Sequence, residues 1–308
     1  MLSPDTKGVF AIAPTPFLPD GSLDAASVDR MTDFYWEAGS DGLTILGIMG
    51  EAQKLEPEES LQIVRQVIAR AGGRPIIVGV SAPGFAAMRR LAGEAMAAGA
   101  AAVMIAPPSS MRTDDQIVGY YAQAIAQIGT DIPFVLQDHP QATLVQMTPG
   151  VIKRIINDNP SCVMLKHEDW PGLDKITALR DWERDGSLRH VSILCGNGAL
   201  FLELEMQRGA DGAMTGYAFP EMLRDVVDLS LAGDLDAAQD LFDAHLPLLR
   251  YEQQPVISLS VRKYVLQKRG AIAHDALRAP GPKLTAPTKA DVERLLARLA
   301  RTDSRAAF

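Results

Sequence analysis

The sequence predicts an α/β fold: a (β/α)8 TIM barrel that carries a helical extension at its carboxyl end. Short apolar runs recur eight times along the first two thirds of the 308-residue chain. They are almost uninterrupted in hydrophobicity, which is typical of parallel strands covered on both faces. Helical patterns lie between them at spacings of roughly 20 to 35 residues, the rhythm of a barrel. A doubly wound sheet is the alternative that this rhythm leaves open.

The eight runs give the expected strands. We predict strands at residues 9–13, 43–46, 76–80, 102–105, 134–136, 163–165, 191–194 and 212–215.

The segment 57–71 illustrates how each helix is predicted. Pro57 suits the first helical position, and the acidic residues that follow it suit the positive end of a helix. Apolar residues recur at spacings of three and four, and the Gly72-Gly73 pair ends the helix. The same signals predict helices at 86–98, 116–128, 148–157, 173–185, 199–208, 222–232, 235–251, 255–269 and 290–301.

The strand signal stops after Pro220, which suggests two parts. We expect the barrel to occupy residues 1–220 and a helical extension, packed on the barrel, to occupy 221–308. The proline-rich stretch 279–287 precedes the last predicted helix.

Composition and charge favour a small-molecule substrate. The 38 acidic and 30 basic residues give a formal charge of −8, which argues against nucleic acid or an anionic membrane as the main partner. Two cysteines cannot build a disulfide framework, and no spacing suggests a metal site or a nucleotide-binding loop. Residues 1–8 lack the apolar run of an export signal, and no apolar stretch reaches membrane-spanning length, so we expect a chain that is neither exported nor embedded in a membrane. We therefore expect a cytoplasmic protein without cofactor or metal.

Lys166 is the first candidate for chemistry, since working residues of a barrel follow the carboxyl ends of its strands. It directly follows the apolar run 162–165, so its stem leaves a packed strand and its amine faces the mouth. Loss of solvent at such a place favours the neutral, nucleophilic amine. An ordinary exposed lysine at a strand end is the alternative.

Two glycine-containing turns are candidates for holding an anion. Gly47-Ile48-Met49-Gly50-Glu51 follows the second run, and its glycines let backbone N–H groups approach a carboxylate. Gly196-Asn197-Gly198 follows the seventh run and precedes a helix, although a plain structural turn is the favoured interpretation there.

Asp138 and Glu168 are the acids closest to the ends of neighbouring strands five and six. The alternation of side chains along a strand puts Glu168 on the same side as Lys166 and His167 on the other. For both acids, an ion pair or a helix cap is the structural alternative. We expect loop or capping roles for His139 and His167.

Several segments together match the pattern of one known family. They are Thr15-Pro16-Phe17, Gly47 to Glu51, Leu136 to Pro140, Lys166 and Gly209 to Gly216. These segments resemble the dihydrodipicolinate synthase/N-acetylneuraminate lyase superfamily of pyruvate-type class I aldolases. The resemblance implies that Lys166 is the lysine that forms a Schiff base and that the segment 47–51 is the carboxylate-binding loop.

Departures from the family pattern favour a particular subgroup. The family tyrosine that relays protons is Gln137 here, and both threonines of the carboxylate loop are replaced, by Ile48 and Met49. The strand-four tyrosine pair is Pro108-Ser109, and the arginine of dihydrodipicolinate synthases is Ala142. The chain is more similar to the 2-keto-3-deoxy-sugar-acid dehydratases of this superfamily.

The resemblance implies a lyase that acts on a 2-oxo acid by dehydration, aldol cleavage or condensation. Lys166 attacks the keto carbon, Glu168 or else Asp138 moves protons, and Gln137 orients the substrate. The backbone from Gly47 to Glu51 holds the carboxylate, and Gly196, Thr215 and Gly216 line the far wall.

The resemblance also implies a homo-oligomer, a tetramer or a dimer. A barrel that binds a 2-oxo acid or sugar acid without turnover is the alternative, and a phosphate-binding barrel using the turn at 196–198 is a third.

Overall fold

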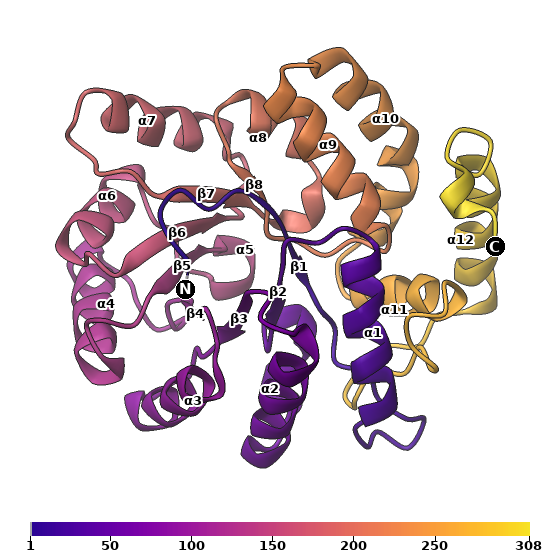
Figure 1. Ribbon diagram of the computed structural model, residues 1–308, viewed down its shortest axis with the longest axis horizontal. Helices are drawn as coiled ribbons and strands as arrows, with labels where there is room; N and C mark the ends of the chain where they lie inside the picture. The colour runs from indigo at the N-terminus through magenta and orange to yellow at the C-terminus, as the bar shows by residue number, and fades with distance from the viewer. Residues whose placement is uncertain (1) are drawn as a thin grey trace.

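The computed structural model describes residues 2–308 and shows a closed barrel of eight parallel strands in chain order, with β8 pairing back onto β1 (Figure 1). The barrel prediction is confirmed, and closure rules out the doubly wound sheet. All eight predicted strands are present: β1 (Gly8–Ile12), β2 (Gly42–Ile45), β3 (Ile76–Gly79), β4 (Ala102–Ile105), β5 (Phe134–Asp138), β6 (Cys162–His167), β7 (Ser192–Cys195) and β8 (Gly212–Ala213).

Helices surround the strands and continue beyond β8. They are α1 (Ala25–Glu37), α2 (Pro57–Ala71), α3 (Phe85–Ala98), α4 (Asp114–Ile128), α5 (Pro140–Thr143), α6 (Pro149–Asp158), α7 (Leu173–Arg184), α8 (Leu202–Gln207), α9 (Pro220–Ala232), α10 (Leu235–Glu252), α11 (Ser258–Lys268) and α12 (Ala286–Leu299). Among residues 2–308, no helix combines the length and the apolar character that a membrane crossing requires.

Helix α2 has the predicted bounds because its end signals act as expected. Pro57 occupies the first turn, and the Glu59 carboxylate accepts a hydrogen bond of 2.9 Å from the Glu56 N–H. Gly72 ends the helix in the left-handed conformation at a φ of 60°.

Helix α1 lies outside the predicted ranges. Its buried face includes the polar residues Ser27 and Thr32, which interrupt the apolar stripe that would have marked it. The Asp24 carboxylate caps it and binds both the backbone N–H and the hydroxyl of Ser27.

Two hydrophobic cores cover the two faces of the strands. On β1, Phe10 and Ile12 pack inside the barrel with Met104, while Val9 and Ala11 pack outward against the helices. This double coverage explains the continuous hydrophobicity of the strands.

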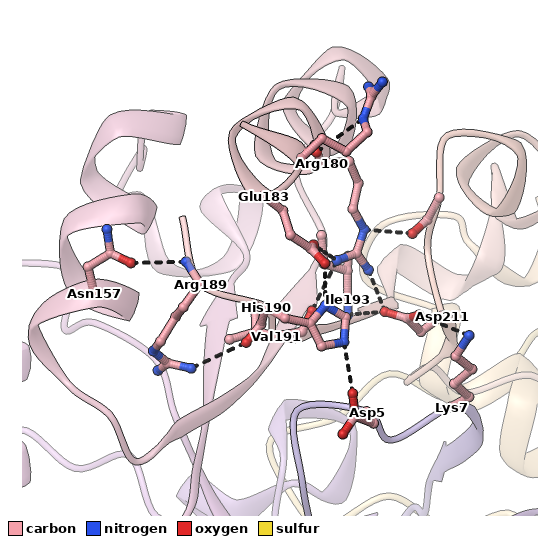
Figure 2. A network of polar contacts seen from close by, with 12 residues as sticks. Asp5, Lys7, Asn157, Arg180, Glu183, Arg189, His190, Val191, Ile193 and Asp211 are labelled. Carbon is pink, nitrogen blue, oxygen red and sulfur yellow. Dashed lines mark hydrogen bonds and ion pairs between the residues drawn. The ribbon is translucent and has the colours of Figure 1, made fainter. Parts of the chain in front are cut away.

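The amino ends of β1, β7 and β8 are held by a polar network at the end of the barrel opposite the carboxyl ends of the strands (Figure 2). The Asp211 carboxylate accepts from the Ile193 N–H at 2.9 Å and pairs with Arg180. Glu183 pairs with Arg180 and with His190, and the His190 ring also lies 3.5 Å from Asp5. These contacts fix the far end of the barrel and leave the carboxyl ends of the strands free to form a site.

Candidate active site

A small cavity of about 80 Å³ opens at the carboxyl ends of the strands. It exceeds the space that one water molecule occupies. Its lining comes from several strand ends, from the loops that follow them and from the helical extension: Ile12, Ile48, Met49, Gln137, His139, Lys166, Glu168, Asn197, Gly198, Thr215, Gly216, Gln253 and Arg262.

Lys166 and Glu168 form an ion pair inside this cavity. Lys166 is 5% exposed, and its Nζ lies 3.1 Å from Glu168 Oε2. The predicted alternation is confirmed, because both side chains point to the same side of the chain and His167 points to the other. The immediate neighbour of the amine is thus a carboxylate, in addition to the apolar wall that the sequence suggested.

Two hydrogen bonds hold Glu168 in place besides its ion pair with Lys166. The Gln137 Nε2 donates to its Oε2 at 2.7 Å, and the Asn197 backbone N–H donates to its Oε1 at 3.3 Å. Gly196 makes room for it, since a Cβ there would overlap the Glu168 side chain. Burial alone raises the pKa of Glu168, but Lys166, His139 and the Gln137 amide outweigh burial and lower the pKa below its ordinary value.

His139 also faces the cavity, although we expected a loop or capping role. It stands at the start of α5 without capping that helix through its side chain, which corrects the capping interpretation. Its Nδ1 lies 3.5 Å from Glu168 Oε2 and has no hydrogen-bond partner within residues 2–308. Burial is the main cause that lowers its pKa, so the ring is neutral at pH 7.

Asp138 does not reach the cavity. Its Oδ2 accepts from Lys175 at 2.7 Å on the outer side of β5, and the same face buries His167. Burial raises the pKa of Asp138 to about 6, against the opposing effect of Lys175. The structure therefore separates the two acids that the sequence placed together. For Asp138 the structural alternative holds, because its carboxylate forms an ion pair with Lys175.

The loop after β2 contributes Ile48 and Met49 to the cavity wall. Gly47 instead lines an adjoining cavity of about 430 Å³, which shares Ile48 and Gln137 with the first. Gly50 packs behind the loop, where its carbonyl accepts a 2.6 Å hydrogen bond from the Thr15 hydroxyl.

Glu51 points away from the cavity, contrary to its predicted place in the binding loop. Its Oε1 accepts from Lys263 Nζ at 2.6 Å, and its Oε2 accepts from Lys54 Nζ at 2.8 Å. The backbone of Glu51 is left-handed, with a φ of 53°, so the loop turns sharply there.

The main chain of the turn after β7 serves the neighbouring side chains and forms no backbone cradle for a phosphate. The Asn197 N–H is directed to Glu168, and Gly198, with a φ of 63°, leaves space for the Gln253 side chain. This contact pattern argues against the phosphate-binding alternative.

Sequence reasoning missed Arg262 and Gln253, which reach the cavity from the extension beside Thr215 and Gly216. Arg262 is 1% exposed and lies on α11. A signal was present, because Arg262 and Lys263 are adjacent cations in a helix that also buries Val261, Val265 and Leu266.

The arrangement combines an amine, a carboxylate and a neutral imidazole within reach of one small space, with a guanidinium on its wall. Such a set can attack a carbonyl carbon and move protons next to it. Within the described chain, Glu168 is the only carboxylate that lines this cavity.

Comparisons with known proteins agree with this chemistry. The model of the dihydrodipicolinate synthetase family matches residues 5–299. An L-2-keto-3-deoxyarabonate dehydratase from Azospirillum brasilense is 31% identical over 304 residues, covering 96% of each chain. A 4-hydroxy-tetrahydrodipicolinate synthase from Methylococcus capsulatus is 28% identical, covering 76% of this chain and 78% of that one.

A solved structure is closer still in sequence. The crystal structure described as dihydrodipicolinate synthase from Rhodopseudomonas palustris is 61% identical, covers 96% of this chain and 99% of that chain, and superposes with a TM-score of 0.95. The family resemblance that the sequence motifs suggested is confirmed. The chain belongs to the dihydrodipicolinate synthetase family and is a Schiff-base-forming lyase of the class I aldolase type.

Proposed function

We propose that this lyase dehydrates a 2-keto-3-deoxy sugar acid through a Schiff base on Lys166. The observation that carries the proposal is the pair formed by Lys166 Nζ and Glu168 Oε2, which lie 3.1 Å apart in the cavity. In this proposal Glu168 acts as both the acid and the base. The similarity to the Azospirillum dehydratase over 96% of both chains supports dehydration. The replacement of the relay tyrosine by Gln137 and of the arginine by Ala142 supports it over dihydrodipicolinate synthesis.

The first step forms the covalent link. Glu168 accepts a proton from the Lys166 ammonium when substrate enters, and the neutral amine attacks the C2 carbonyl carbon. The C2 oxygen leaves as water, and an iminium remains between C2 and Nζ. Gln137 keeps the Glu168 carboxylate turned towards the amine through its 2.7 Å hydrogen bond.

The second step removes water across C3 and C4. The iminium draws electrons from C3, so Glu168 can take a C3 proton and leave an enamine. The enamine then expels the C4 hydroxyl, which takes from Glu168 the proton removed at C3 and departs as water. Hydrolysis of the remaining iminium returns Lys166 and releases the product, so the net change is the loss of one water.

Asp138 has no part in this scheme. Its carboxylate is bound to Lys175 behind β5, so the proton-carrying role that the sequence left open passes to Glu168 alone. Thr215, Ile48 and Met49 line the walls around the reacting carbons. We further propose a cytoplasmic location, in keeping with two cysteines that are buried and unpaired in the described structure. A homo-oligomer, a tetramer or a dimer, is proposed on the family resemblance alone.

Reductive trapping tests the proposal directly. The chain is incubated with pyruvate or with 2-keto-3-deoxyarabonate, treated with borohydride, and analysed by intact mass and peptide mapping. We expect one adduct, on Lys166, and none in Lys166→Ala. The absence of an adduct with every 2-oxo acid tried, together with ligand-induced thermal stabilisation that survives Lys166→Ala, would make the protein a binding barrel and overturn the proposal.

A further inference from the structure

Arg262 has a hydrogen-bonding capacity that the protein leaves unused. Its Nε donates to Glu252 Oε1 at 2.7 Å, which balances the charge of the guanidinium. Its Nη1 is buried and has no hydrogen-bond partner anywhere in residues 2–308. Burial of an unpaired charged donor costs free energy, so this group calls for a partner from outside the chain, and a ligand in the adjoining cavity can supply one.

The residue that follows the end of β8 by three positions leaves room for this donor beside the cavity. Gly216 follows β8, and a Cβ at that position would overlap Arg262 Nη1. The guanidinium therefore passes over the main chain at the end of the strand and joins the wall that holds Thr215. Any residue larger than glycine would close this path.

Two further donors share the same wall. The Gln253 Nε2 and the Asn197 Nδ2 are buried, line the cavity and have no partner among the described residues. Together with Arg262 they form an unsatisfied group of hydrogen-bond donors in a cavity of about 80 Å³. A group rich in acceptor oxygens matches it, and a planar carboxylate matches the fork of an arginine best.

The loop after β2 lacks side chains for the same task. Ile48 and Met49 have no hydroxyl, so this loop offers a substrate carboxylate only its backbone. We propose that Arg262, delivered from the helical extension, anchors the C1 carboxylate of the 2-oxo acid, with Gln253 and Asn197 as its auxiliary donors. The proposal rests on the proposed function, since it places the carboxylate one bond from the carbon that Lys166 attacks.

The test compares pyruvate with pyruvamide, which has the same ketone and nearly the same shape but no charge. In the borohydride reaction, the unsubstituted chain is expected to require much less pyruvate than pyruvamide for half-maximal labelling. The variant Arg262→Gln is expected to raise the half-saturating pyruvate concentration by about ten- to a hundredfold and to leave that for pyruvamide unchanged.

Three companion variants separate recognition from folding. Arg262→Lys keeps the charge without the fork, so we expect partial recovery. Gly216→Ala is expected to displace the guanidinium and to weaken pyruvate labelling with Arg262 still present. Arg269→Gln removes another cation near the same helix, one that pairs with Glu221 and does not line the cavity, and should leave the pyruvate preference intact.

The outcomes distinguish the two proposals. If Arg262→Gln labels with pyruvate at unchanged concentrations, or loses pyruvate and pyruvamide labelling equally, the carboxylate anchor is wrong. If the unsubstituted chain traps neither ligand, the Schiff base is wrong. In that case thermal stabilisation by pyruvate, measured in Lys166→Ala with and without Arg262→Gln, still tests the anchor, because it requires no covalent step.

Discussion

At the scale of single residues, neighbours decide which of several similar side chains can act. Asp138 and Glu168 are both acidic and both close to the ends of adjacent strands, yet only Glu168 enters the cavity. The reason is the twofold alternation of a strand, which sends Gln137 inward and the next residue outward to Lys175. Proximity to a strand end therefore selects both acids as candidates. Glu168 has an inward-facing position after β6, whereas Asp138 has an outward-facing position on β5.

A pair of matched substitutions tests this division. Glu168→Gln keeps the shape of the side chain but removes its basicity, and we expect kcat to fall by about a hundredfold or more. Asp138→Asn should leave kcat within a few-fold, because its carboxylate contacts Lys175 outside the cavity. Steady-state kinetics with 2-keto-3-deoxyarabonate provides the measurement. A larger loss in Asp138→Asn than in Glu168→Gln would contradict the assignment.

At the scale of elements, the helical extension after residue 220 contributes side chains to the cavity, among them Gln253 and Arg262. Helix α9 follows β8 and packs against β1 and α8, which is the place of the eighth barrel helix, so the proposed boundary at 220 falls at its amino end. Helix α11 then brings two adjacent buried cations to the mouth. Arg262 lines the cavity, and Lys263 holds Glu51 of the loop after β2 at 2.6 Å.

The contact between α11 and that loop makes a prediction about stability. Burial lowers the pKa of Lys263 to about 8, and Glu51 opposes this effect, so the lysine remains mostly charged at pH 7. Lys263→Met leaves Glu51 buried with one cation fewer, and we expect a loss of about 3 to 5 kcal/mol in the free energy of unfolding. Urea unfolding monitored by circular dichroism measures it.

The double variant Lys263→Met/Glu51→Leu serves as the control. It removes both charges, so it should recover a large part of the stability that the single variant loses. A double variant as unstable as the sum of the two single variants would show that the two side chains do not act as a pair.

At the scale of the whole molecule, two buried acids on α8, Glu203 and Glu205, link stability to pH. Burial raises the pKa of Glu205 to about 8 and that of Glu203 to about 7, because each carboxyl loses water without a nearby cation to replace it. Burial likewise lowers the pKa of His167 to about 4. These groups fold in their neutral forms, which links stability to pH from both sides.

The sign follows from proton binding. Between pH 4.5 and about 8 the folded chain keeps the Glu205 proton, whereas the unfolded chain releases it, so stability contributed by this group is lost as the pH rises. We expect the free energy of unfolding to fall between pH 6 and 8. Glu205→Gln should reduce that slope by about 1 kcal/mol per pH unit.

Urea midpoints at pH 6, 7 and 8 check this prediction. Glu203→Gln gives a graded comparison, since the contribution of Glu203 to the slope of stability against pH should diminish above pH 7. An unchanged slope in Glu205→Gln would mean that the carboxyl is ionised in the folded protein.

The sequence by itself determined the fold class, the eight strands, most of the helices and the segments that meet at the mouth. These features depend on local periodicity and on end signals, which are written in consecutive residues: the bounds of α2 follow from Pro57 and Gly72. That Lys166 and Glu168 point to the same side of the chain could also be predicted, because strand alternation is a local rule.

Only the tertiary structure decided which of those residues share a cavity. Arg262 is 96 residues beyond Lys166 in the chain, and no local pattern encodes that Gly216 leaves a path for its guanidinium. The same holds for Glu51. Its partner Lys263 lies far along the chain and holds the Glu51 carboxylate away from the cavity. Long-range packing sets these contacts, since each depends on where a separate helix of the extension comes to rest against the barrel.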